Sequence, residues 1–454
     1  MRAKILVVSE RLWPEGGGGE LATHLILGLL QEFFDITVVT GTPSPVVYKG
    51  VKYVYTRLLS VREKQRLWIS NTLLTRQSWF RNLLEEADVV YIPRFSFPII
   101  NEAKKLKKRV IVHLHDYIPI SYTATVLAPA EAHLKTLVYD DLVIELTKDL
   151  VHGIGAAALY WIPRLVRYLI SYADKIICVS KRQAEIVSQV APELSKKIRV
   201  VYNPIPKLPD IAKNPENYLL FKGGLSMVKG YHYVEALAKV LPSNIKIIVT
   251  GTPNRGVHKR LRNILFIGRV QYDQLVKLHR NALAVLFTSI WEEPLPFAVT
   301  ESLMLKTVPV ASKVGGIPEI LNGTMFEKFL FKPAEFNVFI DKGLFEDSLI
   351  MITSDHGQLL GDHGRLGHWV FLFDELLKVP LAIKYPEDKE LDLESPRLSL
   401  KYVSLTKIKP FILTLIKNDK FGDTLLYSDF VFAESYGLHL NLRRLTLTSY
   451  EEKM

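Results

Sequence analysis

Short apolar runs recur along the first two hundred residues, and longer mixed segments separate them. The runs comprise residues 4–8, 36–40, 88–92, 109–115, 175–180 and 198–202. Runs rich in Val and Ile are typical of strands buried on both faces of a parallel sheet. The separating segments, such as residues 20–30, have helical character. This alternation predicts βαβ units, so the fold class is α/β.

A second set of apolar runs follows a linker rich in Pro and Asn at residues 202–218. These runs comprise residues 218–222, 246–250, 264–267, 284–288 and 308–312. We expect two doubly wound, Rossmann-like domains, residues 1–202 and residues 203–341. Ligands of such sheets bind at the carboxyl ends of the strands, so two facing domains predict a deep cleft.

The pattern changes after about residue 340. One apolar run, residues 348–353, precedes a stretch dense in Asp, His and Gly, and no third doubly wound sheet is indicated. We interpret residues 342–454 as a small α/β fragment.

Composition and charge narrow the classes of partner. Hydrophobic residues make up 48% of the 454 residues, which is ordinary for a globular protein. The formal net charge of +11 favours anionic partners such as phosphorylated substrates or acidic lipids. No Lys/Arg run has the density of a nucleic-acid-binding arm, so no nucleic acid partner is expected. The single cysteine, Cys178, excludes an intrachain disulfide, and no signal peptide is apparent, so we expect a cytoplasmic protein.

The longest apolar stretch, residues 153–170, contains Pro163, Arg164 and Arg167. A membrane-spanning helix needs about 20 mostly apolar residues, so this stretch is a poor candidate. Two interpretations remain open. The stretch is either a buried helix pair or an interfacial amphipathic segment, with Trp161 and Tyr168 at the inner face of a membrane. The second would make the protein a peripheral membrane protein.

Candidate chemistry lies at several strand ends. Gly17 and Gly18 belong to a glycine turn between the first strand and a helix, where backbone N–H groups can approach a phosphate. His115 ends another strand. Lys229 follows a glycine-rich turn of the second domain, where it can hold a diphosphate as a point charge.

The segment from Trp291 to Glu319 is the most specific feature. Glu293 lies in a Pro-punctuated loop, and Glu301 lies among apolar neighbours where an unpaired carboxylate would be costly. We therefore expect Glu301 to have a hydroxyl or amide partner.

As a set, these features resemble the family-4 retaining glycosyltransferases over about residues 2–325. The motifs are the glycine turn, V-H-L-H-D, A-D-K-I-I-C-V-S, V-Y-N-P, G-G-L-S-x-x-K-G, E-x7-E and V-G-G-I-P-E, in that order. The resemblance implies a GT-B fold. It also implies a nucleotide-sugar donor, transfer to a glycan or lipid-linked acceptor, and no divalent metal cofactor for the transfer.

The resemblance also implies roles for eight residues. Glu293 would hold donor-sugar hydroxyls and His115 would lie beside that sugar, as the two catalytic residues. The six donor-binding residues would be Gly17 and Gly18 over the phosphates, Lys229 on the diphosphate, Glu301 on the ribose, and Gly315 and Gly316 in the turn behind the site. The chain departs from the family at Gly224, where an Arg is usual, so Lys222 is the expected substitute. We expect the segment that normally closes the second domain to stop near Ile340.

Residues 349–368 and 374–385 resemble the C-terminal part of the sulfatase and alkaline-phosphatase superfamily. The resemblance implies Asp355 and His356 as metal ligands. The superfamily's nucleophile belongs to a half that this chain lacks, so we expect a vestigial divalent-metal site at most. Cys178 and Arg182 have the spacing of a sulfatase nucleophile motif, which we interpret as coincidence because both lie within a glycosyltransferase motif.

Three hypotheses of function follow. The first is a hexosyltransferase-like glycosyltransferase, and the second is a hydrolase of sulfate or phosphate esters. The third is a non-catalytic fusion remnant. Lys229, Glu293 and Glu301 favour the first, provided that they line one shared cavity.

Overall fold

The structure is a computed structural model. It describes residues 2–333, with gaps at 62, 147–149, 210–213, 215, 242–243 and 252–262. Beyond residue 333 it describes residue 412 and the backbone of short strands. Residues 64, 65, 150, 151 and 157 are described by their backbone alone.

The N-terminal domain is built on a seven-stranded sheet in which every neighbouring pair of strands is parallel. Its order is β3-β2-β1-β4-β5-β6-β7. The strands are β1 (Lys4–Ser9), β2 (Asp35–Thr40), β3 (Val51–Tyr55), β4 (Val89–Ile92), β5 (Arg109–Leu114), β6 (Lys175–Cys178) and β7 (Ile198–Val200). The apolar pattern predicts all of them except β3, an edge strand whose side chains are mostly exposed or half-buried.

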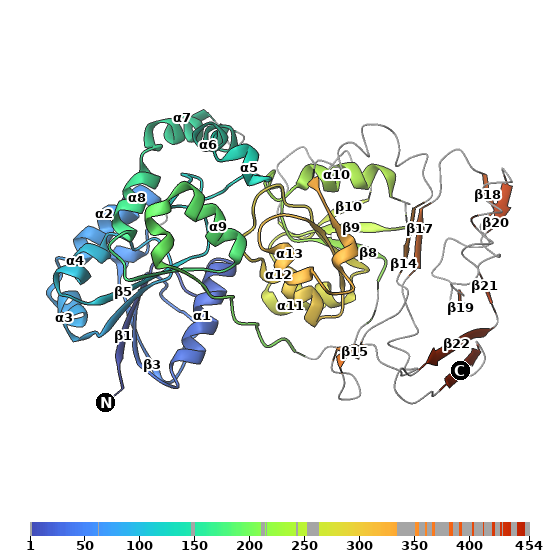
Figure 1. The fold of residues 1–454 in the computed structure, drawn as a ribbon, viewed down its shortest axis with the longest axis horizontal. Coiled ribbons are helices and arrows are strands. Elements are labelled where there is room, and N and C mark those ends of the chain that lie inside the picture. Colours follow the sequence, from blue (N-terminus) through green and yellow to red (C-terminus); the bar gives the residue numbers. More distant parts are fainter. Residues whose placement is uncertain are drawn as a thin grey trace.

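Helices cover both faces of this sheet (Figure 1). They are α1 (Gly18–Leu30), α2 (Lys64–Leu74), α3 (Ser78–Glu86), α4 (Ile99–Lys105), α5 (Ala130–His133), α6 (Leu137–Leu146), α7 (Leu150–Leu159), α8 (Ile162–Ile170) and α9 (Lys181–Val190), with 3-10 turns η1 (Arg57–Leu59) and η2 (Pro192–Lys197). Alternate residues of β1 enter different cores: Leu6 and Val8 pack into one cluster, Ile5 and Val7 into another. This follows from the two-residue period of a strand.

The second domain repeats the plan with a six-stranded parallel sheet of order β10-β9-β8-β11-β12-β13. The strands are β8 (Tyr218–Phe221), β9 (Lys246–Val249), β10 (Ile264–Phe266), β11 (Ala284–Phe287), β12 (Val308–Ser312) and β13 (Leu330–Phe331). The helices are α10 (Tyr231–Val240), α11 (Tyr272–Asn281), α12 (Phe297–Met304) and α13 (Ile317–Leu321), with the 3-10 turn η4 (Glu327–Phe329). The prediction of two Rossmann-like α/β domains is confirmed.

The long apolar stretch of the sequence divides between α7 and α8. Helix α8 buries Val166, Leu169 and Ile170 against the sheet, whereas Trp161 and Tyr168 remain exposed. The buried-helix interpretation therefore holds for one face of α8 only. Among the described residues, no helix has the length and apolar character needed to cross a membrane.

Beyond residue 333, the described strands pair only in twos. Strand β14 (Ile350–Thr353) is antiparallel to β17 (Leu381–Lys384), and β22 (Phe430–Tyr436) is antiparallel to β23 (Arg443–Ser449). Further short pairs are formed by β15 (Leu359–Leu360), β16 (Leu366–Gly367), β18 (Glu390–Asp392), β19 (Tyr402–Val403), β20 (Lys420–Gly422) and β21 (Tyr427–Ser428). The candidate metal ligands Asp355 and His356 lie outside the described residues.

Candidate functional site

The two domains enclose one large cavity of about 1160 Å³. The β1–α1 turn and His115 contribute from the first domain, and the ends of β8, β11 and α12 contribute from the second. Six predicted site residues line this cavity: Gly17, Gly18, His115, Lys229, Glu293 and Glu301. Lys229, Glu293 and Glu301 therefore meet in one place, as the glycosyltransferase hypothesis requires.

Glu293 lies in the loop between β11 and α12, and its carboxylate is buried. Its Oε1 accepts three hydrogen bonds, from Lys229 Nζ at 2.5 Å, Ser289 Oγ at 2.6 Å and Trp291 Nε1 at 2.9 Å. The Lys229 ammonium also lies 5.1 Å from the centre of the Trp291 ring. None of the described residues donates to Oε2, so this oxygen keeps its capacity for a ligand hydroxyl.

Glu301 lies on α12 and is also buried. Lys222 Nζ donates to its Oε2 at 2.8 Å, and the Tyr272 hydroxyl donates to its Oε1 at 2.7 Å. The expectation of a hydroxyl partner therefore matches Tyr272, and the stronger charge partner is Lys222. Burial and the Glu301 charge together raise the pKa of Tyr272, which keeps its hydroxyl a donor.

Behind Lys222 lies the buried imidazole of His279. Lys222 Nζ is 3.2 Å from His279 Nδ1, and His279 Nε2 is 2.7 Å from Ser302 Oγ. Burial, and then the Lys222 charge, lower the pKa of His279 well below its ordinary value, so the ring is neutral. An ammonium can only donate, which assigns the ring proton to Nε2 and makes Ser302 its acceptor. Lys222 is thus fixed in place by two partners rather than free to follow a ligand.

The glycine turn of the first domain is held by a buried charge cluster. The Gly17 N–H donates to Glu20 Oε2 at 2.7 Å, and Glu20 Oε1 lies 2.7 Å from Arg94 Nη1. Arg94 also binds Glu10 at 2.8 Å. Because Glu20 already holds one N–H of the turn, a phosphate at Gly17 would have to displace this carboxylate.

His115 lines the cavity and has a buried ring nitrogen without a partner in the described part of the chain. Its Nε2 has no hydrogen-bond partner among the described residues, which is costly unless a ligand supplies one. Burial, then His113 and Arg94, lower the pKa of His115 well below its ordinary value. The ring is therefore neutral, and it can position a sugar hydroxyl but does not offer a positive charge.

Gly315 and Gly316 do not line the cavity; they support the Glu293 loop from behind. Gly315 has φ +54°, and a Cβ there would lie 2.0 Å from the Glu293 carbonyl oxygen. A Cβ on Gly316 would lie 2.3 Å from the Pro294 carbonyl oxygen, and the Gly316 N–H donates to Glu293 O at 2.8 Å. Their place agrees with a role in shaping the turn, not with direct donor contact.

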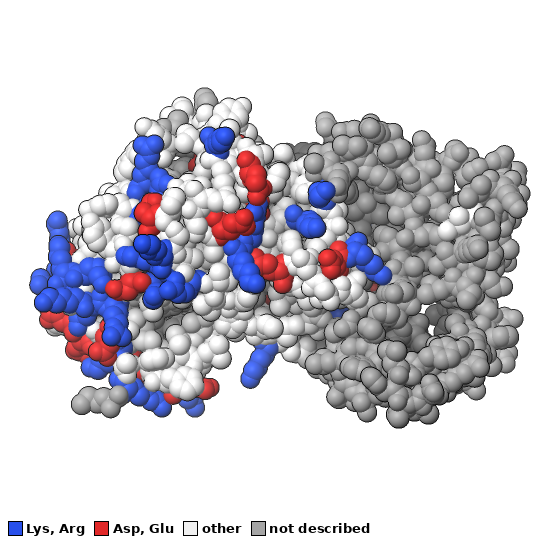
Figure 2. All heavy atoms as spheres, in the orientation of Figure 1, with Lys and Arg blue, Asp and Glu red and all other residues white. Residues whose placement is uncertain are grey.

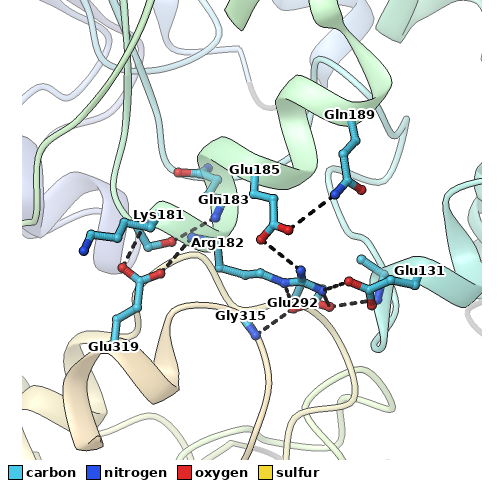
Figure 3. Close-up of polar contacts among 11 residues, drawn as sticks. Glu131, Lys181, Arg182, Gln183, Glu185, Gln189, Glu292, Gly315 and Glu319 are labelled. Carbon is cyan, nitrogen blue, oxygen red and sulfur yellow. Dashed lines mark hydrogen bonds and ion pairs between the residues drawn. The ribbon is translucent and has the colours of Figure 1, made fainter.

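A polar network joins the two domains beside the Glu293 loop (Figure 3). Glu292 binds Arg182 Nη2 at 2.9 Å, accepts the Ala130 N–H at 2.8 Å and accepts the Gly315 N–H at 2.7 Å. Glu319 of α13 accepts the first two N–H groups of α9, from residues 181 and 182, at 2.9 and 2.8 Å. An acidic side chain at a helix N-terminus is favourable, so this contact stabilises the arrangement of the two domains.

The sequence pattern missed several of these residues. Glu292 and Arg182 carry the interdomain network. Tyr272 and Trp13 both line the cavity, and their rings pack edge to face with centres 5.3 Å apart. The adjacent acids at 292–293 were the available signal, since a loop rarely buries two carboxylates without partners for both. Cys178 lies in the core, and burial raises its pKa to about 12, which agrees with the sulfatase-like spacing being coincidental.

Each of the two domains matches a glycosyltransferase family model. Residues 15–207 match the family Glycosyltransferase Family 4, and residues 208–342 match Glycosyl transferases group 1. The chain is 29% identical over 186 residues to the uncharacterized glycosyltransferase MJ1607 of Methanocaldococcus jannaschii, covering 34% of this chain and 47% of that protein. A stretch of 44 residues is 54% identical to the low-salt glycan biosynthesis sulfotransferase Agl7 of Haloferax volcanii, covering 9% of this chain and 11% of that protein.

The chain thus covers less than two thirds of either curated relative. Among solved structures, sucrose-phosphate synthase from Thermosynechococcus elongatus is similar, with a TM-score of 0.52 and 14% identity, covering 76% of this chain and 90% of that one. This likeness concerns the fold. With the two family matches, it confirms the prediction of a GT-B fold.

Proposed function

We propose that this chain of two glycosyltransferase domains transfers a sugar, with retention, from a nucleotide-sugar donor to a glycan or lipid-linked acceptor. The observation that carries the proposal is the shared cavity. Two lysine–carboxylate pairs, Lys229–Glu293 and Lys222–Glu301, line it opposite the glycine turn and His115.

In this proposal, the charge of the departing diphosphate falls to Lys229. Its side chain is more exposed than that of Lys222, at 38% against 12%. Its ammonium can therefore reach a ligand in the cavity. A cation placed where negative charge develops stabilises the transition state more than the ground state. The proposal therefore requires no metal ion for the transfer.

The two carboxylates have different tasks in the proposal. Glu293 offers its unoccupied Oε2 to donor-sugar hydroxyls, while Lys229, Ser289 and Trp291 fix the orientation of the group. Glu301 holds the ribose beside Tyr272. A carboxylate fixed in advance loses little orientational freedom when the sugar binds.

Calorimetry with a panel of UDP- and GDP-sugars, without divalent metal, tests the proposal. We expect one of them to bind wild-type protein, and Glu301→Ala to weaken that binding about tenfold, as for the loss of one charged hydrogen-bond partner. Glu32→Ala, at an exposed position on the surface, is the matched control and should bind as wild type. If no nucleotide sugar binds, the fusion-remnant hypothesis is favoured instead.

For the tail, we propose a sulfatase-superfamily fragment without hydrolase activity. Its motif around Asp355 and His356 supports the origin, and no segment within these 454 residues is assigned to the nucleophile half, which supports the inactivity. We expect no turnover of p-nitrophenyl sulfate or phosphate with added divalent metals. Turnover that Asp355→Ala abolishes would contradict this.

A further inference from the structure

Helix α6 has reversed polarity. It buries its three carboxylates, at Asp140, Asp141 and Glu145, whereas none of its large apolar residues is buried and four of them, including Val138, are exposed. Tyr139, Val143 and Leu146 follow one another at helical spacing, and Tyr139 is 66% exposed. A helix on the surface of a water-soluble domain normally has the opposite arrangement, so the outer face of α6 is built for a different neighbour.

The buried carboxylates are held by specific partners rather than left by chance. Asp141 accepts hydrogen bonds from Ser121 Oγ at 2.7 Å, from Thr123 Oγ1 at 2.5 Å and from the Tyr122 N–H at 2.8 Å. Asp140 accepts from Thr136 Oγ1 at 2.9 Å and lies 3.1 Å from His133 Nδ1. These contacts fix the orientation of α6, so its apolar side cannot turn inward.

The neighbouring helices extend the exposed apolar surface. Helix α7 packs against α6, and Ile154 on α7 is 61% exposed. Tyr160 and Trp161, in the turn between α7 and α8, and Tyr168 on α8 are also exposed. Tyr and Trp are the residues enriched at the interface between membrane and water.

The exposed charged side chains of this region are all positive among the described residues. From residue 134 to 173, every described Asp and Glu is buried, whereas Lys135 and Arg164 are exposed; Lys148 and Asp149 lie outside the described residues. On the face drawn in Figure 2, the area over α6 and α7 is largely uncharged. A surface of this kind suits a partner with an apolar interior and an anionic surface layer.

We propose that the outer face of α6 and α7, with the turn at residues 160–161, docks on an anionic lipid bilayer. Apolar and aromatic side chains enter the interface, and Lys135 and Arg164 contact the acidic headgroups. None of the described helices crosses the membrane in this arrangement, and the protein binds to one leaflet.

This surface is joined to the wall of the cavity. The chain just before α5 pairs with the loop of the second domain: the Ala128 N–H donates to Ile290 O at 2.9 Å, and the Glu292 N–H donates to Val126 O at 2.8 Å. Docking would therefore place the cleft beside the lipid surface, where a lipid-linked acceptor is presented. This consequence rests on the proposed function, whereas lipid binding itself does not.

Co-sedimentation of the full chain with phosphatidylcholine vesicles, with and without phosphatidylglycerol, tests the proposal. We expect binding to the anionic vesicles that weakens as salt is raised. Tyr139→Ser with Ile154→Ser should lower the partition coefficient at least about tenfold. Lys135→Gln with Arg164→Gln should lower it about fivefold for each charge removed, for anionic vesicles only.

The matched control is Leu29→Ser with Phe33→Ser, two exposed apolar residues at the end of α1 and just beyond it, which should bind vesicles as wild type. Equal binding of wild type to both kinds of vesicle, or unchanged binding of the Tyr139/Ile154 variant, would overturn the proposal. The proposal would also fail if wild-type protein bound no vesicles but self-associated, and the Tyr139/Ile154 variant abolished that self-association. Calorimetry on the same variants separates the two proposals, because donor binding should stay intact when lipid binding is lost.

Discussion

The two walls of the cavity differ in their chemistry. The second domain contributes charge, in the form of two lysine–carboxylate pairs that are already formed. The first domain contributes backbone at Gly17 and Gly18 and the neutral ring of His115, with its acidic Glu20 neutralised by Arg94. Under the proposed function, this contrast assigns the charged donor to the second domain, and shape and neutral hydroxyl groups to the first.

The largest effect should come from the charged wall. Glu293→Gln keeps the size of the side chain but replaces the carboxylate that three donors orient. We expect kcat/KM for transfer to fall about 10²–10³-fold, as for loss of one preorganised electrostatic group. Initial rates with the nucleotide sugar that binds measure this, with Glu32→Gln as the surface control. An unchanged rate in a folded variant would remove Glu293 from the mechanism.

Replacing Lys222 should mainly lower stability, whereas replacing Lys229 should mainly weaken ligand binding. Lys222→Met leaves the buried Glu301 without its cation and should lower the free energy of unfolding by about 3 kcal/mol. Lys229→Met leaves Glu293 two further donors, Ser289 and Trp291, so we expect a smaller loss of stability than for Lys222→Met, but a 10- to 100-fold weaker affinity for nucleoside diphosphate. Denaturant unfolding and calorimetry measure the two quantities. The same pattern for both variants would contradict the division of tasks.

In the wall from the first domain, adding a methyl group to the glycine turn should affect stability at one position and donor binding at another. A Cβ on Gly19 would lie 2.9 Å from Arg94 Nη1, so Gly19→Ala should cost about 1–3 kcal/mol in unfolding free energy. A Cβ on Gly17 meets no atom within 4 Å, so Gly17→Ala should change stability by less than about 0.5 kcal/mol while its methyl narrows the donor site. Thermal melts and donor titrations test the pair. Equal destabilisation by both variants would show that the turn is held differently.

Acid should lower the free energy of unfolding modestly through buried histidines in both domains. Burial lowers the pKa of His113 to about 3 and lowers the pKa of His115 and His279 in the same direction. Below pH 6.5 the unfolded chain takes up protons that the folded chain refuses, so stability falls as pH drops. We expect a loss of about 1 kcal/mol per histidine between pH 6.5 and 5.5, measured by urea unfolding. A smaller slope in His113→Gln would confirm the source, and an unchanged slope would contradict it.

The sequence predicts the sheets well because buried parallel strands must be continuous apolar runs. Edge strand β3 escapes this rule, since its side chains are not buried on both faces. The polarity of α6 could not be predicted either. Its pattern of Asp140, Asp141 and Glu145 is typical of a solvated face, and only the tertiary partners at Ser121 and Thr123 reveal that this face points inward.

For the candidate site, too, the sequence predicts some features and tertiary packing decides the others. Motif spacing brings Lys229, Glu293 and Glu301 to one cavity, but it does not say which lysine serves which carboxylate. The sequence indicates Lys222 only as a replacement for a missing Arg, whereas its contacts with Glu301 and His279 are set by packing between β8, α11 and α12. Contacts across the interface, such as Glu319 with the start of α9, leave no periodic signal in the sequence.

Hydrogen–deuterium exchange with and without the bound nucleotide sugar tests the central claim most directly, because it reports both walls in one measurement. The account predicts slower exchange on donor binding at residues 222–230 and 289–301 of the second domain, together with residues 16–20 of the first. Slower exchange confined to segments outside this cavity, or none at all with a donor that calorimetry shows to bind, would contradict it.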